Sequence, residues 1–285
     1  RVSKGTGRFS TMIRAVLGWE REVEPDMVAS GDAEARAGGR PGPGCDRSTS
    51  GWCPAGRNAG RWAGAVRGAT REQFDRVNVA GIRTLLQALE AQPEPPRLLS
   101  LSSLAARKPE LSHYAASKRA GEQVLLEKAE RVQWMALRPP AVYGPGDTEL
   151  LPLFRAMARG FAPVPGAADA RFSMVFVDDL AAAVLTWLEA GAVRNGIYTL
   201  EDGKAGGYDW QAVADTVTAI CGRRVRLMPV PAWLLNTVAR INSQAAQLFG
   251  YAPMLTPEKL RELRHPDWVC DSEELRAEID WQPRY

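Results

Sequence analysis

The chain has 285 residues, with 36 Lys and Arg, 33 Asp and Glu, two His and four Cys, and 45% of its side chains are hydrophobic. Because the cysteines form no close pair and only two histidines are present, we exclude a disulfide framework, a tetrahedral zinc site and a multi-histidine metal site. No apolar run approaches the ~18 residues of a membrane span, and no secretory signal pattern is present, so we expect a soluble, cytoplasmic protein without a transmembrane segment.

The net charge of +3 is unevenly distributed. Residues 1–67 carry 11 Lys and Arg against 7 Asp and Glu, whereas residues 68–285 carry 25 against 26. In the first segment the arginines are scattered among Gly, Ala and Pro, without the clustered basic face and interleaved aromatic residues that nucleic-acid binding requires. We therefore expect no nucleic-acid partner.

The first unusual segment runs from Ala29 to Trp62 and contains no Val, Ile, Leu, Met, Phe or Tyr. Strands need β-branched and aromatic residues, and helices need an apolar stripe. The composition therefore predicts no strand here, only a long and poorly ordered loop.

From about Ala63 onward, helical and strand patterns alternate. Apolar residues at helical spacing predict helices over 71–91, 112–131, 149–159, 179–190 and 209–221, the second with Ser112 as its N-cap. Apolar runs predict strands over 97–103, 132–144, 172–177 and 197–200. This alternation predicts an α/β fold, a doubly wound parallel sheet with helices on both faces, which binds ligands at the carboxyl ends of its strands.

Polar groups suited to proton transfer follow one of these strands. Ser102 and Ser103 close the strand at 97–103, and Tyr114 and Lys118 share one face of the next helix because they are four residues apart. An ammonium group stabilises a phenolate, and a serine hydroxyl polarises a carbonyl, so the set suits chemistry at a C–OH or C=O carbon. Hydride must come from a cofactor, because no side chain supplies it.

Five segments occur in a characteristic order: NVAGIRTLLQAL, LLSLSSLAA, YAASKRAGEQVL, LRPPAVYGPGD and FVDDLAAAV. Together they resemble the extended short-chain dehydrogenase/reductase family, also called the NAD-dependent epimerase/dehydratase family. The resemblance is strong from about residue 63 to 183 and weaker through TPEKLREL and WQP near the C-terminus. It implies a Rossmann-type domain with a smaller, partly helical substrate domain, and NAD or NADP as cofactor.

The resemblance also implies roles for individual residues. Tyr114 would be the catalytic acid/base, Lys118 would lower its pKa and hold the nicotinamide ribose, and Ser103 would orient the carbonyl. Ser102 is interpreted as a structural neighbour. Asn78 matches a helix asparagine of the family, for which backbone support is at least as good an interpretation as proton relay.

Further positions match the cofactor-binding segments of the family. Pro139, Ala141 and Val142 match the segment beside the nicotinamide ring. Ala63 and Gly64 match the small pair near the adenosine ribose and phosphates.

Other candidates receive structural interpretations. We interpret Asp178 and Asp179 as N-terminal helix capping residues. His113 has no identifiable partner and is interpreted as a helix-start residue, and Tyr143 as a packing residue at the edge of the site.

The glycine-rich turn that would hold the pyrophosphate is degraded. Its best match, VSKGTGRFS at 2–10, places Lys4, Gly7 and Ser10 at the three glycine positions, so only Gly7 fits. The length ahead of Ala63 suits a dinucleotide-binding half, but its composition does not. Two explanations stay open: a reading-frame change upstream of about residue 62, or a diverged loop.

The implied domains are residues 1–143 plus 171–195 for the cofactor, and 144–170 plus 196–285 for the substrate. We expect an NAD(P)-dependent oxidoreductase acting on a secondary alcohol or ketone, with a nucleotide-sugar epimerase or dehydratase as the alternative. A third hypothesis is a non-catalytic or cofactor-deficient member of the family. Only ten residues separate Ser103 from Tyr114, as in family members acting on hydroxysteroids or dihydroflavonols, whereas nucleotide-sugar epimerases have a longer connection.

Partners are less well defined by the sequence. The substrate would be a small hydroxy or keto compound or a nucleotide sugar, and the resemblance implies a homodimer through the helices at 71–91 and 112–131. The apolar stripe in residues 231–250 could line a substrate pocket or contact a membrane surface, although core packing is the commoner explanation.

Overall fold

A parallel sheet is the centre of the fold in the computed structural model, which describes residues 58–61, 64–68, 70–249, 251, 253 and 255–285. Its strands lie in the order β1 (Asn58–Arg61), β2 (Arg97–Leu101), β3 (Trp134–Arg138) and β8 (Gly196–Thr199). All three pairings are parallel. The strands lie across the sheet in the same order in which they follow one another along the chain. Within the described part of the chain, the main sheet therefore shows no reversal of strand order of the kind at which open α/β sheets bind dinucleotides.

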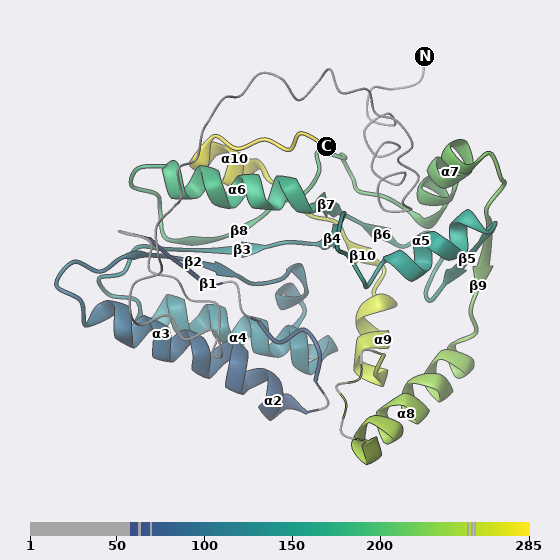
Figure 1. The fold of residues 1–285 in the computed structure, drawn as a ribbon, viewed down its shortest axis with the longest axis horizontal. Coiled ribbons are helices and arrows are strands. Elements are labelled where there is room, and N and C mark those ends of the chain that lie inside the picture. Colours follow the sequence, from purple (N-terminus) through teal and green to yellow (C-terminus); the bar gives the residue numbers. More distant parts are fainter. Residues whose placement is uncertain (1–57, 62–63, 69, 250, 252, 254) are drawn as a thin grey trace, which may run out of the picture.

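Helices cover both faces of this sheet (Figure 1). One face carries α2 (Arg71–Asp75), the π-helical turn η2 (Arg76–Ala80), α3 (Gly81–Glu90) and α4 (His113–Lys128), and the other carries α6 (Val177–Glu189) and α10 (Glu273–Ile279). The predicted α/β class with helices on both faces is confirmed.

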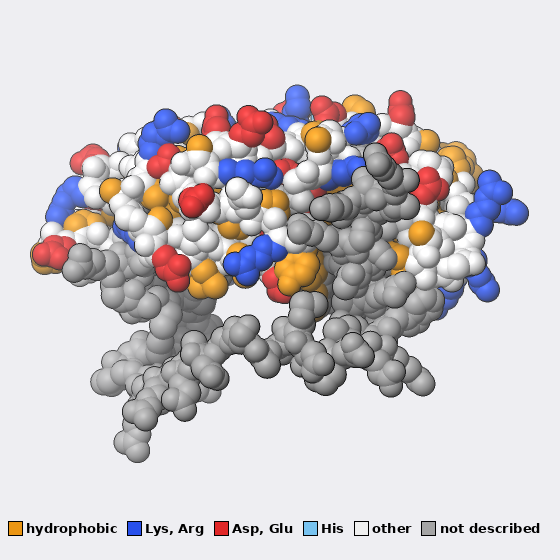
Figure 2. Space-filling view, turned by 90° about the horizontal axis from the view of Figure 1, so that it is seen from above, with side chains coloured by type: hydrophobic (Ala, Val, Ile, Leu, Met, Phe, Trp, Pro, Cys, Tyr) orange, Lys and Arg blue, Asp and Glu red, His pale blue; other side chains and the backbone are white. Residues whose placement is uncertain are grey.

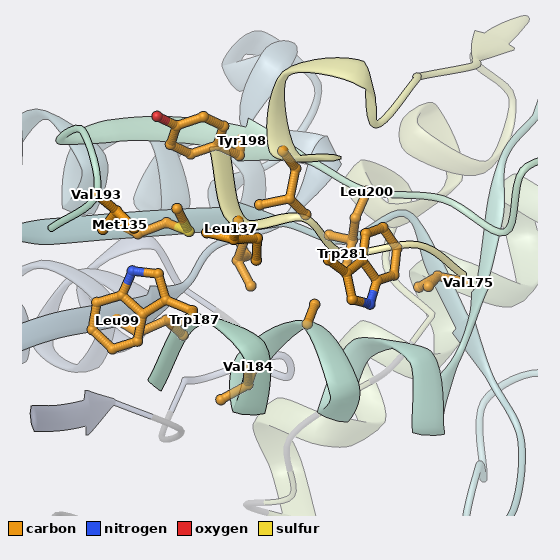
Figure 3. Close-up of a cluster of buried hydrophobic side chains, with 13 residues drawn as sticks. Leu99, Met135, Leu137, Val175, Val184, Trp187, Val193, Tyr198, Leu200 and Trp281 are labelled. Carbon is orange, nitrogen blue, oxygen red and sulfur yellow. The ribbon is translucent and has the colours of Figure 1, made fainter. Parts of the chain in front are cut away.

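Alternating side chains of the strands supply two cores, one on each face. Leu98 and Ala136 pack with apolar residues of α3 and α4. Leu99, Met135 and Leu137 point the other way and pack against Trp187 of α6 and other residues of this second core (Figure 3). Leu98, Leu99, Met135 and Leu137 are fully buried, which fits continuous apolar runs in a sheet covered on both sides.

The prediction that residues 29–62 contain no strand is wrong at their C-terminal end. The backbone of β1 pairs residue by residue with Arg97–Ser100 of β2, although its sequence, NAGR, has no β-branched or aromatic residue. Because ladder hydrogen bonds are made by the backbone, a neighbouring strand can outweigh weak intrinsic propensity.

The predicted strand at 132–144 is divided into two. Pro139 and Pro140 lack the backbone N–H that a ladder needs, so β3 ends at Arg138. The chain then forms β4 (Ala141–Tyr143), which leaves the main sheet and pairs with β7 (Met174–Phe176). The predicted strand at 172–177 is likewise divided, into β6 (Arg171–Phe172) and β7, which pair with different strands, and the predicted helix at 71–91 is interrupted by η2. The other predicted strands and helices are present with small shifts of their ends.

The remaining elements pack beside the carboxyl end of the sheet (Figure 1). They are η3 (Leu104–Arg107), η4 (Pro109–Leu111), α5 (Leu151–Ala158), β5 (Phe161–Val164), β6 (Arg171–Phe172), α7 (Trp210–Cys221), β9 (Arg226–Pro229), α8 (Ala232–Phe249), α9 (Pro257–Leu263) and β10 (Asp267–Trp268). β5 pairs with β9, and β6 pairs with β10. Among the described residues, no helix is long and apolar enough to cross a membrane.

The apolar stripe of α8 does not belong to the core, contrary to the commoner explanation. Trp233, Val238 and Ile241 are 68%, 46% and 61% exposed, whereas the buried residues among the described side chains of α8 are Ala239 and Ala246. The opposite side of the molecule differs. The face that carries α6 and α10 mixes acidic and basic side chains with small apolar areas (Figure 2).

Candidate functional site

The candidate site lies at the carboxyl ends of β2 and β3, which are held side by side by their backbones. The N–H of Ser102 donates to the carbonyl of Leu137 at 2.7 Å, and the N–H of Leu104 donates to that of Pro139 at 2.9 Å. Ser103 follows β2 and caps η3 by accepting a hydrogen bond from the N–H of Ala105. These contacts place the Ser103 hydroxyl beside the segment that the sequence assigns to the nicotinamide ring.

Tyr114 and Lys118 reach this point from α4, whose N-cap is Ser112, as predicted. Lys118 is buried, and its ammonium donates to the carbonyl of Leu101 at 2.9 Å and lies 5.8 Å from the centroid of the Tyr114 ring. Phe74 packs edge-on against the same ring with centroids 6.0 Å apart. The structure therefore brings Ser103, Tyr114 and Lys118 together.

The environment of the phenol favours its protonated form. Burial raises the pKa of Tyr114, while a hydrogen bond with Ser103 and the charge of Lys259 lower it and the charge of Glu262 raises it. The balance is a raised pKa, although the residue as a whole keeps partial exposure. The charge of Lys259 is one cause that lowers this pKa. The ammonium of Lys118, to which the family resemblance gives that role, lies 5.8 Å from the centroid of the same ring.

Lys259 lies on α9 and has no role that the sequence pattern predicts. Its ammonium lies 5.4 Å from the centroid of the Tyr114 ring and 2.7 Å from Oε2 of Glu262. Burial alone would lower the pKa of Lys259, but the charge and hydrogen bond of Glu262 outweigh it, so the pKa is raised and the ammonium stays charged. Only the match of TPEKLREL to the family pointed to this segment, and no local pattern places it beside Tyr114.

Two further contacts hold α9 against the start of α4. The hydroxyl of Ser112 donates to the buried carboxylate of Glu262. His113, interpreted from the sequence as having no partner, pairs its Nε2 with Glu258 at 3.2 Å. The C-terminal segment is thus fixed directly over the catalytic candidates.

Gly64, one of the residues matched to the cofactor, lies beside the catalytic candidates. Gly64 lies against Lys118, because a Cβ at Gly64 would be 2.8 Å from the Lys118 ammonium. Asn78 is buried. Its side-chain amide accepts a hydrogen bond from the N–H of Ala65 and donates to the carbonyl of Ala65 and to the hydroxyl of Ser117. These bonds support the interpretation that Asn78 holds the backbone. Gly7 and Ala63 lie outside the described residues.

The three residues that match the segment beside the nicotinamide ring differ in exposure. Pro139 is buried, Val142 is half-buried and Ala141 is exposed, with the last two in β4. Ala141 is thus the exposed residue of the three, and its side chain is small.

Three neighbouring residues are structural. Ser102 is buried and donates to Glu122 at 2.6 Å, as expected of a structural neighbour. Tyr143 is buried against Phe176, with ring centroids 5.6 Å apart. The capping interpretation of Asp179 is wrong: its carboxylate accepts hydrogen bonds from the N–H groups of Arg284 and Tyr285, and burial raises its pKa.

No group of His, Cys, Asp and Glu residues that could hold a metal ion occurs in the part of the chain that the structure describes. Together, the parallel sheet, the helices on both faces and the polar residues at the strand ends define a Rossmann-type α/β protein. Residues 59–200 match the NAD dependent epimerase/dehydratase family, and the chain belongs to this family.

Similar proteins include a ceramide reductase from Caulobacter vibrioides, 35% identical over 210 residues. The match covers 74% of this chain, which spans 64% of the length of that protein. Solved structures with the same fold include UDP-glucose 4-epimerase from Thermotoga maritima, with a TM-score of 0.58, 17% identity and coverage of 80% of this chain and 72% of that one. A dTDP-glucose 4,6-dehydratase from Bacillus anthracis in complex with NAD has a TM-score of 0.55, 16% identity and coverage of 79% and 67%.

Proposed function

We propose that the chain is an NAD(P)-dependent oxidoreductase that interconverts a ketone and a secondary alcohol, with Tyr114 as the proton donor and acceptor. One observation carries the proposal: Ser103, Tyr114 and Lys118 meet at the carboxyl ends of adjacent parallel strands, and Ser103 is hydrogen-bonded to Tyr114. This is where α/β sheets bind ligands.

Near neutral pH, the protonation state of Tyr114 suits reduction of a carbonyl group better than oxidation of an alcohol. Because burial raises the pKa of Tyr114, its hydroxyl keeps its proton and can donate it to the oxygen of a substrate carbonyl. The Ser103 hydroxyl would orient that oxygen by donating a second hydrogen bond. Oxidation of the alcohol would require the phenolate and would therefore increase as the pH rises.

The described residues fit the nicotinamide half of a dinucleotide. Gly64 leaves the approach to the Lys118 ammonium clear, since any side chain there would meet that group. Lys118 and Tyr114 would hold the nicotinamide ribose, Pro139, Ala141 and Val142 would lie beside the ring, and Gly64 would face the adenosine side. When bound, the cofactor would supply or accept the hydride. On this assignment residues 1–143 and 171–195 would form the cofactor domain, and 144–170 plus 196–285 the substrate domain. β8 and α10 are the exceptions, because they lie in the central sheet and its core and therefore go with the cofactor domain.

The ceramide reductase relative supports a lipid carbonyl as the first substrate to test. The second candidate function is a nucleotide-sugar epimerase or dehydratase, which is favoured by solved structures of the same fold such as MoeE5 in complex with UDP-glucuronic acid and NAD. The two differ in cofactor balance, because a reductase consumes NAD(P)H, whereas an epimerase returns the hydride to its own substrate.

Calorimetric titration of the purified chain with NAD(H) and NADP(H) tests the proposal, followed by steady-state NAD(P)H consumption with ceramide-type and simple ketones. We expect binding of at least one dinucleotide and ketone-dependent consumption. Turnover of a UDP-sugar without net consumption would favour the second candidate. Absence of binding at millimolar concentration would contradict both and favour a cofactor-deficient family member.

A further inference from the structure

The exposed side of α8 is more apolar than its buried side. Leu234, Val238, Ile241 and Leu248 follow one another at intervals of four, three and seven residues, which places them on one helical stripe. The large apolar residues that α8 exposes are Trp233, Leu234, Val238, Ile241, Leu248 and Phe249, each between 40% and 80% exposed. Among the α8 side chains that the structure describes, the buried ones are small, Ala239 and Ala246. This apolar face therefore contributes little to the fold of the chain that exposes it.

The segment around α8 is basic and contains no acid. From Arg223 to Pro257 the chain has four arginines, Arg223, Arg224, Arg226 and Arg240, and no Asp or Glu. β9 leads into α8 and exposes Arg226 and Met228, which share one side of the strand. The opposite face of the molecule, by contrast, intersperses charges of both signs (Figure 2).

An apolar helical stripe with a tryptophan near one end, an arginine in the same helix and further arginines in and before the strand that leads into it matches the chemistry of a bilayer surface. Apolar side chains enter the boundary between headgroups and acyl chains, Trp residues favour that boundary, and Arg residues pair with anionic headgroups. We propose that the surface formed by α8 and β9 docks the protein on an anionic phospholipid membrane, with α8 lying in the interfacial plane. The proposal does not depend on the reaction at Tyr114.

Charge distinguishes this partner from a second copy of the chain. A symmetric contact would place the same patch on both subunits, so the arginines of the two copies would approach one another. The segment from Arg223 to Pro257 has no Asp or Glu of its own that would pair with them. An anionic membrane supplies the missing negative charge.

Sedimentation with extruded vesicles tests the proposal on the purified chain. We expect binding to vesicles of equal parts phosphatidylcholine and phosphatidylglycerol, weaker binding to pure phosphatidylcholine, and a decrease at high salt. Removing apolar area with Trp233→Ser/Ile241→Ser should lower the partition coefficient at least about tenfold. Arg226→Gln and Arg240→Gln should each lower it about fivefold.

Leu185→Ser is the matched control, since Leu185 is 58% exposed but lies on α6, away from this surface. It should leave vesicle binding unchanged, and circular dichroism should be the same for all variants. Absence of binding by the unmodified chain, or equal binding by Trp233→Ser/Ile241→Ser, would overturn the proposal. Dimerisation that this double variant abolishes, without vesicle binding, would also overturn it and assign the surface to a second copy.

Discussion

Two lysines from distant parts of the sequence lie beside Tyr114, and they have different surroundings. Lys118 donates to the backbone carbonyl of Leu101 at the end of β2, which fixes the position of its ammonium. Lys259 is paired with Glu262, and the negative charge of that carboxylate partly cancels the effect of the Lys259 ammonium on the pKa of Tyr114. The partial cancellation explains why burial decides the direction of the Tyr114 pKa shift.

This arrangement predicts opposite effects for the two members of the pair. A cation favours the phenolate, so Lys259→Met should raise the pKa of Tyr114 further, move the pH profile of alcohol oxidation to higher pH and slow oxidation severalfold at fixed pH. Glu262→Gln should move the profile to lower pH. The measurement is the initial rate of NAD(P)H formation as a function of pH.

Lys259→Arg keeps the charge and is the control, which should retain the profile of the unmodified protein. A purely structural role for Lys259 would change the amplitude of the profile and not its midpoint. Identical midpoints for Lys259→Met and the unmodified protein would therefore contradict this role of Lys259.

At the scale of elements, α4 and the π-helical turn η2 approach so closely that only glycine fits between them. A Cβ at Gly121 would lie 2.6 Å from the carbonyl oxygen of Asn78 and 2.9 Å from Cδ1 of Ile82. Because the first of these is a backbone atom, Gly121→Ala should lower the free energy of unfolding by about 1–3 kcal/mol and displace Asn78.

Denaturant unfolding of Gly121→Ala measures this loss. Gly191→Ala is the matched control, since no heavy atom lies within 4 Å of a Cβ there, and its effect should stay within about 0.5 kcal/mol. Equal stabilities for the two variants would contradict the close approach of η2 and α4.

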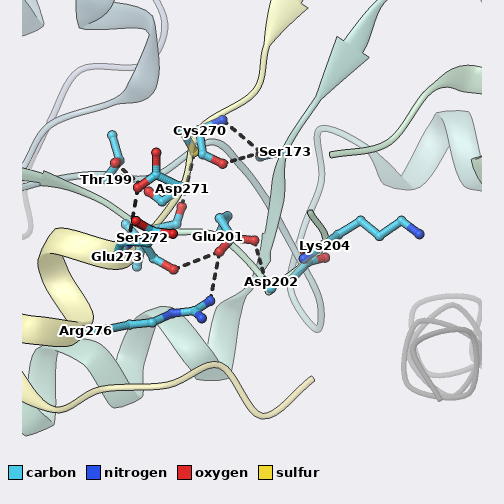
Figure 4. A network of polar contacts seen from close by, with 12 residues as sticks. Ser173, Thr199, Glu201, Asp202, Lys204, Cys270, Asp271, Ser272, Glu273 and Arg276 are labelled. Carbon is cyan, nitrogen blue, oxygen red and sulfur yellow. Dashed lines mark hydrogen bonds and ion pairs between the residues drawn. The ribbon is translucent and has the colours of Figure 1, made fainter. Parts of the chain in front are cut away.

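A polar network after β8 ties the sheet to the C-terminal segment (Figure 4). Glu201 accepts hydrogen bonds from Ser272 at 2.8 Å and from Arg276 at 2.9 Å. The neighbouring Asp202 accepts one from Tyr208 at 2.6 Å. Burial raises the pKa of Asp202 to about 6 in spite of this bond, so its ionised form is disfavoured in the native state.

The raised pKa predicts a pH-dependent loss of stability. The unfolded chain ionises Asp202 near its ordinary pKa of about 4, so the native state loses stability as the pH rises from there through about 6. Asp202→Asn removes this loss and should increase the free energy of unfolding by roughly 2 kcal/mol near pH 8 and by little near pH 4. Thermal unfolding at both pH values provides the measurement, and an equal effect of the substitution at both would contradict the burial argument.

At the scale of the whole molecule, the C-terminal segment connects the sheet with the site. α10 and Trp281 complete the core on the α6 face, Asp179 binds the backbone of Arg284 and Tyr285, and α9 lies against Tyr114. The catalytic candidates are therefore enclosed by residues more than 140 positions later in the chain.

Local patterns were sufficient for much of this architecture. The apolar runs predicted β2, β3 and β8, and the four-residue spacing predicted that Tyr114 and Lys118 share a face of α4. These features depend on neighbours within one element. The sequence did not reveal β1, whose pairing outweighs its composition, or Lys259, whose position depends on tertiary packing. The exposed face of α8 was also unpredictable, because the same periodicity suits a buried helix and a surface helix.

The most direct test of the central claim compares Tyr114→Phe with the unmodified protein in dinucleotide binding and in ketone-dependent NAD(P)H consumption. Loss of the phenolic hydroxyl removes the proton donor but leaves Lys118 and the ring packing against Phe74 in place. We predict a decrease of kcat by about 10²–10⁴-fold, with a dinucleotide affinity that changes less than about twofold. Unchanged kcat in Tyr114→Phe would contradict the assignment of Tyr114 as the acid/base of the reaction.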